Sequence, residues 1–328
     1  MPDLDVRIGR RRLAAVRQGA TVVLTGPAVF RVVGPGALTC LQGLLTNDLV
    51  QPGDGSMVYG ALLTPKGAIV VDTWVLRHGD GLSLIVPTAG REPALEIFHR
   101  TLPPRLARMA DLTEEWRAAW VLGEHAFRTL LKSGIPVPEG AGRVGAAGEG
   151  ASETLVALAP ETAPFVALLA GPADQVERLA ARLVEAGATA GEESDLQAIR
   201  ILAGWPALGL EIEERTLPQE VRYDEIGGVS YTKGCYTGQE TVARLHFRGH
   251  TNRELRGLVW KDALPPESRA VVADGREVGI VRSTLTLEDR SLGLALVRRE
   301  VGPGEDVVAA GRDAVVVGLP FEPRLVEG

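Results

Sequence analysis

The chain has 328 residues, 45% hydrophobic and 23% charged, which is the composition of an ordinary globular protein with a sizeable core. Lys and Arg number 35 against 42 Asp and Glu, and the net charge of −7 argues against a large non-specific nucleic-acid surface. No apolar run is long enough to cross a bilayer and the Arg-rich start lacks a signal-peptide core, so we expect a cytoplasmic protein.

The first 115 residues predict a mixed lobe of strands and helices. Apolar runs bounded by Gly and Pro are typical of strands, and leucines spaced three or four apart are typical of an amphipathic helix. The expected strands lie at residues 21–24, 29–33, 57–64, 68–76 and 82–87, and the expected helices at 38–49 and 92–108.

Residues 116–248 predict a second lobe of the same kind. The Gly-, Ala- and Pro-rich segment 134–150 within it predicts a mobile loop. The expected strands lie at residues 118–123, 154–158 and 164–170, and the expected helices at 124–132, 173–186, 192–203 and 241–247.

Residues 249–328 have a different texture, with short apolar runs between Gly, Pro and Asp turns and no convincing helical pattern. This pattern predicts a small antiparallel β-barrel. Its expected strands lie at residues 255–260, 270–273, 276–284, 291–297 and 306–308.

The densest group of chemically capable residues is Lys233-Gly-Cys-Tyr-Thr-Gly-Gln-Glu240. Its glycines, Gly234 and Gly238, permit backbone conformations closed to other residues. Cys235 precedes the expected helix, so the helix dipole and the Lys233 ammonium are expected to favour its thiolate. Such a thiolate can act as a nucleophile, a redox sensor or a single metal ligand. The alternative is a tight loop whose cysteine is a small buried hydrophobe.

The rest of the chain offers little else for metal binding. The only other cysteine is Cys40, so the chain lacks the thiolates of a four-cysteine zinc or iron–sulfur site. The five histidines show no metal-ligand spacing: His246 and His250 are four apart, but Gly249 separates them at the expected helix end. We therefore expect no metal site made by this chain alone.

The motif Lys-Gly-Cys-Tyr-x-Gly-Gln-Glu, followed by a basic helix ending Phe-Arg-Gly, resembles the signature of the YgfZ family. That family is related to the glycine-cleavage T-protein, an aminomethyltransferase. The resemblance implies an α+β fold with intertwined folate-binding lobes of T-protein type and a C-terminal antiparallel β-barrel that closes a ring around a central cleft. It extends over most of the chain, at residues 36–48, 60–67, 200–206, 217–220, 279–283 and 293–298.

The resemblance implies tetrahydrofolate as a candidate ligand of the cleft. A pterin needs apolar or aromatic walls with a few polar groups, and its glutamate tail needs cations. The segments that the resemblance turns toward the cleft supply Asp72, Trp205, Tyr236 and Arg244, together with Lys233. From the residues alone, Asp72 is equally well a strand-end turn residue and Trp205 a core aromatic.

Two positions depart from the T-protein pattern. Leu202 stands where T-proteins carry a carboxylate, and Val71 stands where they carry the first of two tandem aspartates. An apolar side chain cannot accept hydrogen bonds from pterin N–H groups. The carboxylate set for aminomethyl transfer is therefore incomplete.

The favoured hypothesis is a folate-binding-fold accessory protein that supports iron–sulfur cluster assembly or repair, and through it tRNA modification. Cys235 and Lys233 are its expected working residues, within a motif completed by Gly234, Gly238, Gln239 and Glu240. Its expected partners are iron–sulfur client or carrier proteins and a folate, with no direct nucleic acid and no membrane.

Whether the chain is an enzyme stays open at this point. The alternative is a tetrahydrofolate-dependent aminomethyltransferase or demethylase in which Asp72 assists one-carbon transfer. A third hypothesis is a degenerate folate fold that serves only as a binding scaffold.

Overall fold

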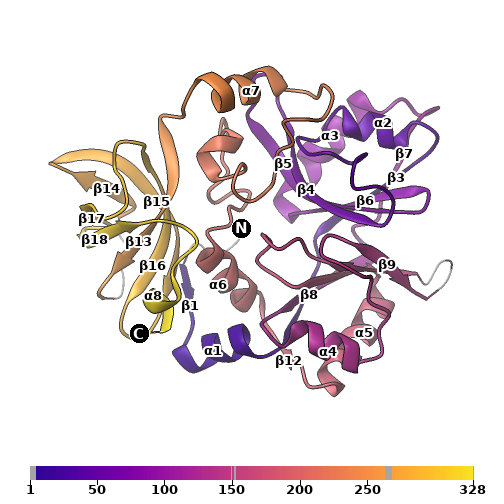
Figure 1. The fold of residues 1–328 in the computed structure, drawn as a ribbon, viewed down its shortest axis with the longest axis horizontal. Helices are drawn as coiled ribbons and strands as arrows, with labels where there is room; N and C mark the ends of the chain where they lie inside the picture. Colours follow the sequence, from indigo (N-terminus) through magenta and orange to yellow (C-terminus); the bar gives the residue numbers. More distant parts are fainter. Residues whose placement is uncertain (1–4, 149, 151–152, 263–267, 328) are drawn as a thin grey trace.

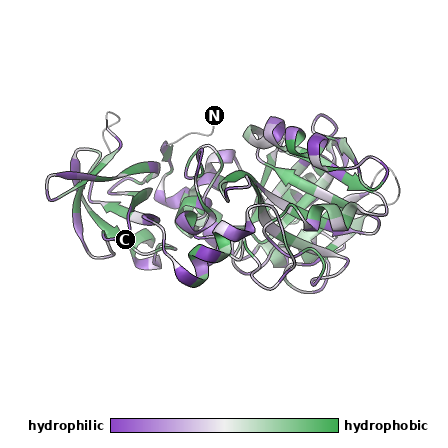
Figure 2. Cartoon of the chain, turned by 90° about the horizontal axis from the view of Figure 1, so that it is seen from above, coloured by the Kyte–Doolittle hydropathy of each residue, from purple (hydrophilic) through white to green (hydrophobic). Residues whose placement is uncertain are grey.

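The computed structural model describes residues 5–148, 150, 153–262 and 268–327. These residues form three β-sheets with helices packed against them (Figure 1). Two sheets form adjoining lobes at the right of Figure 1, and the third closes into a barrel at the left. Figure 2 shows hydrophobic residues concentrated on the strands and hydrophilic ones on helix surfaces and loops. No helix in the described ranges combines the length and apolarity needed to cross a membrane.

The first lobe is a five-stranded antiparallel sheet in the order β4-β5-β6-β3-β7. Two helices and a 3-10 turn pack on it, with the rings of Phe30 and Phe98 meeting edge to face at 5.4 Å. Its elements are β3 (Ala28–Val33), α2 (Ala37–Gln42), β4 (Ser56–Leu63), β5 (Ile69–His78), β6 (Gly81–Val86), η1 (Thr88–Gly90), α3 (Arg91–Thr101) and β7 (Arg108–Asp111).

The second lobe is a six-stranded sheet in the order β12-β2-β8-β11-β10-β9. Strand β2 belongs to this sheet although only Gly26 and Pro27 separate it from β3 of the first lobe, so the two lobes are intertwined. Its elements are β2 (Thr21–Thr25), β8 (Trp116–Leu122), α4 (Ala126–Lys132), β9 (Val144–Ala147), β10 (Thr154–Leu158), β11 (Ala167–Pro172), α5 (Ala173–Glu185) and β12 (Thr189–Ala190).

The C-terminal strands close into an antiparallel barrel because β15 pairs with both β14 and β16. The N-terminal strand β1 (Asp5–Arg7) adds to β15 in parallel. The barrel consists of β13 (Arg253–Trp260), β14 (Ala270–Ala273), β15 (Arg276–Thr286), β16 (Ser291–Arg298), β17 (Asp306–Ala309) and β18 (Arg312–Val317), followed by α8 (Pro323–Glu327). The remaining elements are α1 (Arg10–Gln18), α6 (Glu193–Ala203), η3 (Pro218–Val221) and α7 (Gln239–Arg248).

The fold class expected from the sequence is confirmed, and the differences are local. The helix predicted at 38–49 ends at Gln42, because Gly43 caps it and the chain then turns to pair Leu45 with Leu62. The helix predicted at 92–108 ends at Thr101, ahead of two prolines that cannot continue it. The predicted loop 134–150 contains strand β9, which pairs with β10.

A buried ionic network joins α6 and the segment that follows it to the barrel. Arg200 of α6 donates to Glu211 at 2.9 Å and to Ser283 of β15 at 2.9 Å. Ser283 in turn donates to Glu211, and Arg200 also donates to the Trp205 carbonyl at 2.7 Å. The side chain of Glu211 is fully buried and that of Arg200 is 7% exposed, so each charge depends on the other for compensation.

We predict that Glu211→Ala lowers the free energy of unfolding by about 3–5 kcal/mol, because the Arg200 charge stays buried without its partner. Urea denaturation followed by circular dichroism measures the loss. Glu213→Ala is the matched control, since it breaks a pair with Arg282 in which the carboxylate is 46% exposed, and should cost about 1 kcal/mol or less. Equal losses for the two variants would contradict the prediction.

Candidate functional site

A cleft of about 1380 Å³ lies between the two lobes, α6 and strand β1. Aromatic rings form much of its wall: Trp74 and Trp205 stack with centroids 5.6 Å apart, and Phe165 meets Trp74 edge-on at 5.0 Å. Tyr59 packs behind these rings, 4.8 Å from Trp205. The walls therefore suit a flat, largely apolar ligand.

Asp72 of β5 lines the cleft, and its hydrogen-bonding capacity is only partly used by the protein. Its Oδ2 accepts a hydrogen bond from the Tyr59 hydroxyl at 3.0 Å, and that hydroxyl lies 3.1 Å from the hydroxyl of Tyr223. Its Oδ1 is buried and has no hydrogen-bond partner among the described residues. Burial raises the pKa of Asp72 to about 6, although the hydrogen bond from Tyr59 opposes the rise. A buried acceptor without a partner is costly, and a ligand N–H would satisfy it.

The residues of the cleft fit tetrahydrofolate. The free Asp72 oxygen can accept from the pterin edge, and Trp74 and Trp205 can hold its ring. Arg7 of β1 also lines the cleft and supplies a cation for a carboxylate tail. Leu202, as expected, offers no acceptor: it is 8% exposed and packs in the main core.

Two of the residues that line the cleft were not predicted from the sequence. Trp74 lies two positions after Asp72 on β5, so the alternation of a strand places it on the same face, and that signal was available. Arg7 reaches the cleft only because β1 pairs with β15, nearly the whole chain away, and no local pattern indicates that pairing.

The motif loop, residues 233–238, lies on the first lobe and carries an exposed thiol. Cys235 is exposed, and both it and Cys40 are free cysteines. Thr237 donates its backbone N–H to the Gly43 carbonyl at 3.0 Å. Gly238 has φ of +83°, and a Cβ there would stand 2.7 Å from the Thr64 carbonyl oxygen, so only glycine fits. The loop is thus fixed to the lobe while Cys235 stays exposed.

Lys233 anchors this loop from beneath. Its Nζ donates to the carbonyl oxygens of Gln42, Leu45 and Asn47, each at 2.7 Å. Burial lowers the pKa of Lys233 to about 8, with the Asp48 carboxylate opposing the fall, so the ammonium is charged at neutral pH. All three of its donors are used by these carbonyls, which makes Lys233 a positioning residue rather than the partner of the thiol that the sequence suggested.

Tyr236 and Arg244 require a second correction. Neither they nor Cys235 belong to the described residues that line the cleft. Tyr236 is 7% exposed under the loop, its ring 5.2 Å from the Lys233 ammonium, and burial raises its pKa to about 12. Arg244 is exposed on α7. The hydrogen bonds to the end of α2 and the residues after it hold the motif loop on the first lobe, and these side chains do not line the cleft.

The other motif residues shape the start of α7. The helix begins at Gln239, with Gly238 as its cap and Glu240 exposed in its first turn. Gly234 is exposed and nothing lies within 4 Å of a Cβ built on it. Within the described ranges, no group of three or more His, Cys, Asp or Glu side chains could hold a metal ion.

Comparison with known proteins supports the same family throughout the chain. The family model of the GCVT N-terminal domain matches residues 9–137. An aminomethyltransferase of Rubrobacter xylanophilus is 31% identical over 326 residues, covering 91% of this chain and 81% of the relative. The tRNA-modifying protein YgfZ of Cronobacter sakazakii is 27% identical, covering 86% of each chain.

A solved structure gives the fold. The glycine cleavage system aminomethyltransferase T from Bartonella henselae superposes with a TM-score of 0.78 at 18% identity, covering 95% of this chain and 89% of that one. The fold class inferred from the motif and from the strand pattern is thereby confirmed.

We predict that Lys233→Met lowers the free energy of unfolding by about 2–4 kcal/mol, because three carbonyls, one buried and two partly buried, lose a charged donor. Hydrogen–deuterium exchange should also quicken across residues 233–238. Lys66→Met is the matched control, since Lys66 is exposed and its loss should leave both measurements unchanged. Unaltered exchange in the Lys233 variant would show that the loop does not depend on this anchor.

We predict that Asp72→Asn stabilises the protein increasingly as the pH rises from about 4 to 7. The folded pKa of about 6 lies above the ordinary 3.8, so the folded state holds a proton that the unfolded chain releases. The wild-type carboxyl therefore costs folding free energy as the pH rises through this window, on the order of 3 kcal/mol at pH 7.

Urea denaturation of Asp72→Asn and wild type across this pH range measures the effect. Asp80→Asn removes a carboxylate that is 87% exposed, and the difference from wild type should stay small at every pH. A constant difference for Asp72→Asn would refute the buried, proton-retaining carboxyl.

Proposed function

We propose a function from the premise that this chain belongs to the family of T-protein aminomethyltransferases and YgfZ proteins. It is a cytoplasmic folate-binding accessory protein that supports iron–sulfur cluster assembly or repair through Cys235. The observation that carries this proposal is the exposed thiol on a rigidly anchored loop, set apart from the residues of the cleft.

One exposed cysteine, Cys235, limits what the protein can contribute to a cluster. An iron–sulfur cluster takes four protein ligands, so Cys235 supplies one and a partner protein or a small thiol supplies the others. The cluster is then cargo rather than a resident cofactor. An exposed cysteine on a loop that is already held in place suits such a transient ligand, because little conformational entropy is lost when the partner docks.

The relatives that are named tRNA-modifying proteins suggest where such support is used. We attribute a link to tRNA modification to cluster-dependent modifying enzymes served by this protein. The net charge of −7 favours this indirect role over direct capture of tRNA.

The cleft supplies the folate-binding part of the proposal. Asp72 accepts from the pterin through its free Oδ1, Trp74 and Trp205 orient the ring, and Arg7 pairs with a carboxylate of the tail. A reduced folate, when bound, supplies a carrier for one-carbon units.

A second candidate function is tetrahydrofolate-dependent aminomethyl transfer or demethylation. Asp72 favours it, because a carboxyl with a pKa of about 6 can take or give a proton at Oδ1 near neutral pH. The relative at 31% identity that is named aminomethyltransferase favours it too. The apolar Leu202 and the fully buried Val71 count against it, since neither position adds a second carboxylate.

Two variants separate these functions. In cells that lack their own YgfZ-type protein, we expect wild type and Asp72→Asn to restore the activity of an iron–sulfur enzyme such as aconitase, and Cys235→Ser to fail. In calorimetric titrations with 5-formyltetrahydrofolate, Asp72→Asn should bind about tenfold more weakly, the loss of a hydrogen bond to a charged acceptor. Cys235→Ser should bind like wild type.

The opposite pattern would favour the enzyme. Folate-dependent turnover of a methylamine donor that is lost in Asp72→Asn and kept in Cys235→Ser would replace the accessory role by catalysis. Full restoration of cluster-enzyme activity by Cys235→Ser would overturn the proposed use of the thiol.

A further inference from the structure

Helix α7 has an exposed face that leads from the motif loop to the barrel (Figure 1). The helix buries only Val242, and its exposed residues include Glu240, Arg244, Phe247 and Arg248. The spacing of four, three and one positions puts these side chains on one side of the helix. Phe247 is a large hydrophobic residue, and it is 67% exposed. Arginine beside an exposed aromatic is the composition of a protein-binding surface.

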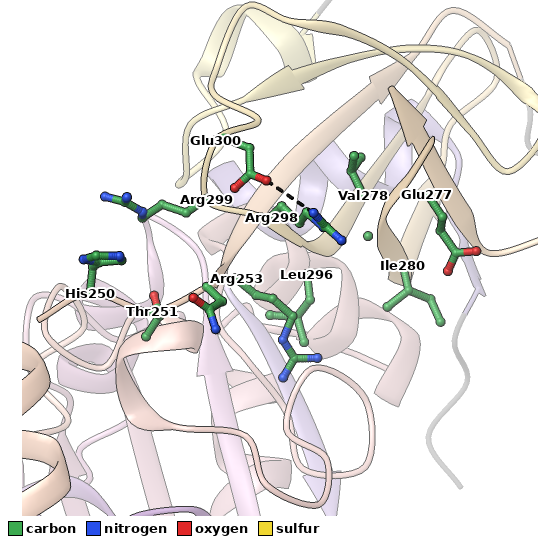
Figure 3. Close-up of a pocket in the computed structure, with 12 residues that line it drawn as sticks. His250, Thr251, Arg253, Glu277, Val278, Ile280, Leu296, Arg298, Arg299 and Glu300 are labelled. Atoms are coloured by element: carbon green, nitrogen blue, oxygen red, sulfur yellow. Dashed lines mark ion pairs between the residues drawn. The ribbon is translucent and has the colours of Figure 1, made fainter. Parts of the chain in front are cut away.

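A groove of about 780 Å³ continues this face where α7 ends. The linker residues 250–252 form one side of it, and strands β13, β15 and β16 of the barrel form the other. In Figure 3, Arg253 and Arg298 occupy the middle of the view, and His250 and Arg299 lie at its left. Leu296 and Ile280 give the groove an apolar floor.

The cations along this path outnumber the carboxylates that can neutralise them. Arg253 pairs with Glu220 at 3.1 Å, and Arg298 pairs with Glu300 at 3.6 Å. Within the described residues, the side chains of Arg244, Arg248 and Arg299 and the ring of His250 have no ion pair or hydrogen bond, and the free carboxylates are Glu240 and Glu277. The chain as a whole carries a net charge of −7, whereas the unpaired groups on this path have a small excess of cations.

The far end of α7 is held in place without any partner. His246 contacts the Asp224 carboxylate at 2.9 Å and stacks on Tyr231 at 3.7 Å between ring centroids. Asp224 also accepts from the Tyr231 hydroxyl. The two arginines and the phenylalanine are therefore presented on a preorganised helix, which reduces the entropy lost on binding.

We propose that α7 and the groove dock the protein that Cys235 serves, and that this protein contributes an acidic segment bearing apolar side chains. The inference rests on the proposed function of the thiol. The carboxylates of the segment pair with Arg244, Arg248 and Arg299, while its apolar side chains lie on Phe247 and the floor of the groove. Ten helical residues span about 15 Å, a length that fits within one interface of standard size.

The charge pattern favours a protein over a nucleic acid. Two of the arginines in the groove already pair with glutamates, and its floor is apolar, whereas a phosphate backbone needs a dense row of unpaired cations. A short acidic peptide with alternating apolar residues satisfies both the rim and the floor.

The test uses the full chain and a fluorescein-labelled peptide of alternating glutamate and leucine, followed by fluorescence anisotropy. We expect saturable binding that weakens as salt rises, and about tenfold weaker binding to the double variant Arg248→Glu/Arg299→Glu. Arg11→Glu/Arg128→Glu is the matched control, since it changes the charge equally at two exposed positions on α1 and α4 and should bind like wild type.

Three results would overturn the proposal: no saturable binding, equal weakening by the control variant, or equal affinity for a peptide of alternating lysine and leucine. Tighter binding of an oligouridylate of the same length would assign the surface to nucleic acid instead. Phe247→Ser should also weaken peptide binding, which separates apolar docking from charge alone.

The docking surface and the proposed thiol chemistry fail in different ways. Cys235→Ser should bind the peptide normally yet fail to restore cluster-enzyme activity, whereas Arg248→Glu/Arg299→Glu should lose both. If the double variant lost peptide binding while Cys235→Ser restored full activity, the surface would stand and the role of the thiol would fall.

Discussion

The buried guanidinium of Arg200 is the constraint on which the joining of the two lobes to the barrel depends. A buried charge must be surrounded by acceptors, and here those acceptors come from the Trp205 carbonyl, from Glu211 and from Ser283 of the barrel. These partners meet only when α6, the segment after it and β15 are assembled. The same arginine lines the cleft, so the requirement that closes the barrel onto the body also shapes the cavity.

Lys233 and Asp72 are both buried, but they differ in whether their hydrogen-bonding groups have partners within the protein. This difference distinguishes a residue that stabilises the fold from one suited to binding. The Lys233 ammonium has three carbonyl partners at 2.7 Å and is complete without a ligand. Oδ1 of Asp72 has no hydrogen-bond partner in the described part of the chain, and it lies in a cavity walled by aromatic rings. Native structures rarely tolerate such an orphaned acceptor, so its position in the cleft marks the part of the fold that is kept for binding rather than for stability.

The sequence predicted the elements that a local residue pattern specifies, and it did not predict short strands that form only by pairing with distant segments. Alternating apolar runs and Gly–Pro turns located β3 to β6 and most of the barrel, and the family motif supplied the topology. The strands β1 and β12 could not be found, since three and two residues carry no period of their own and exist only through their pairing. At the site, Asp72 and Trp205 line the cleft and Tyr236 does not, because the carbonyls that anchor its loop lie nearly two hundred positions earlier in the chain.

The pairing of Asp5 with Thr284 and of Thr21 with Leu122 has a consequence for biosynthesis. A ribosome makes the chain in the direction from β1 to β18, so β2 emerges before its partner β8, and β1 emerges long before its partner β15. A nascent chain of this design therefore exposes the edge of β1 until β15 has been made, and an unpaired strand edge is a template for pairing with another chain.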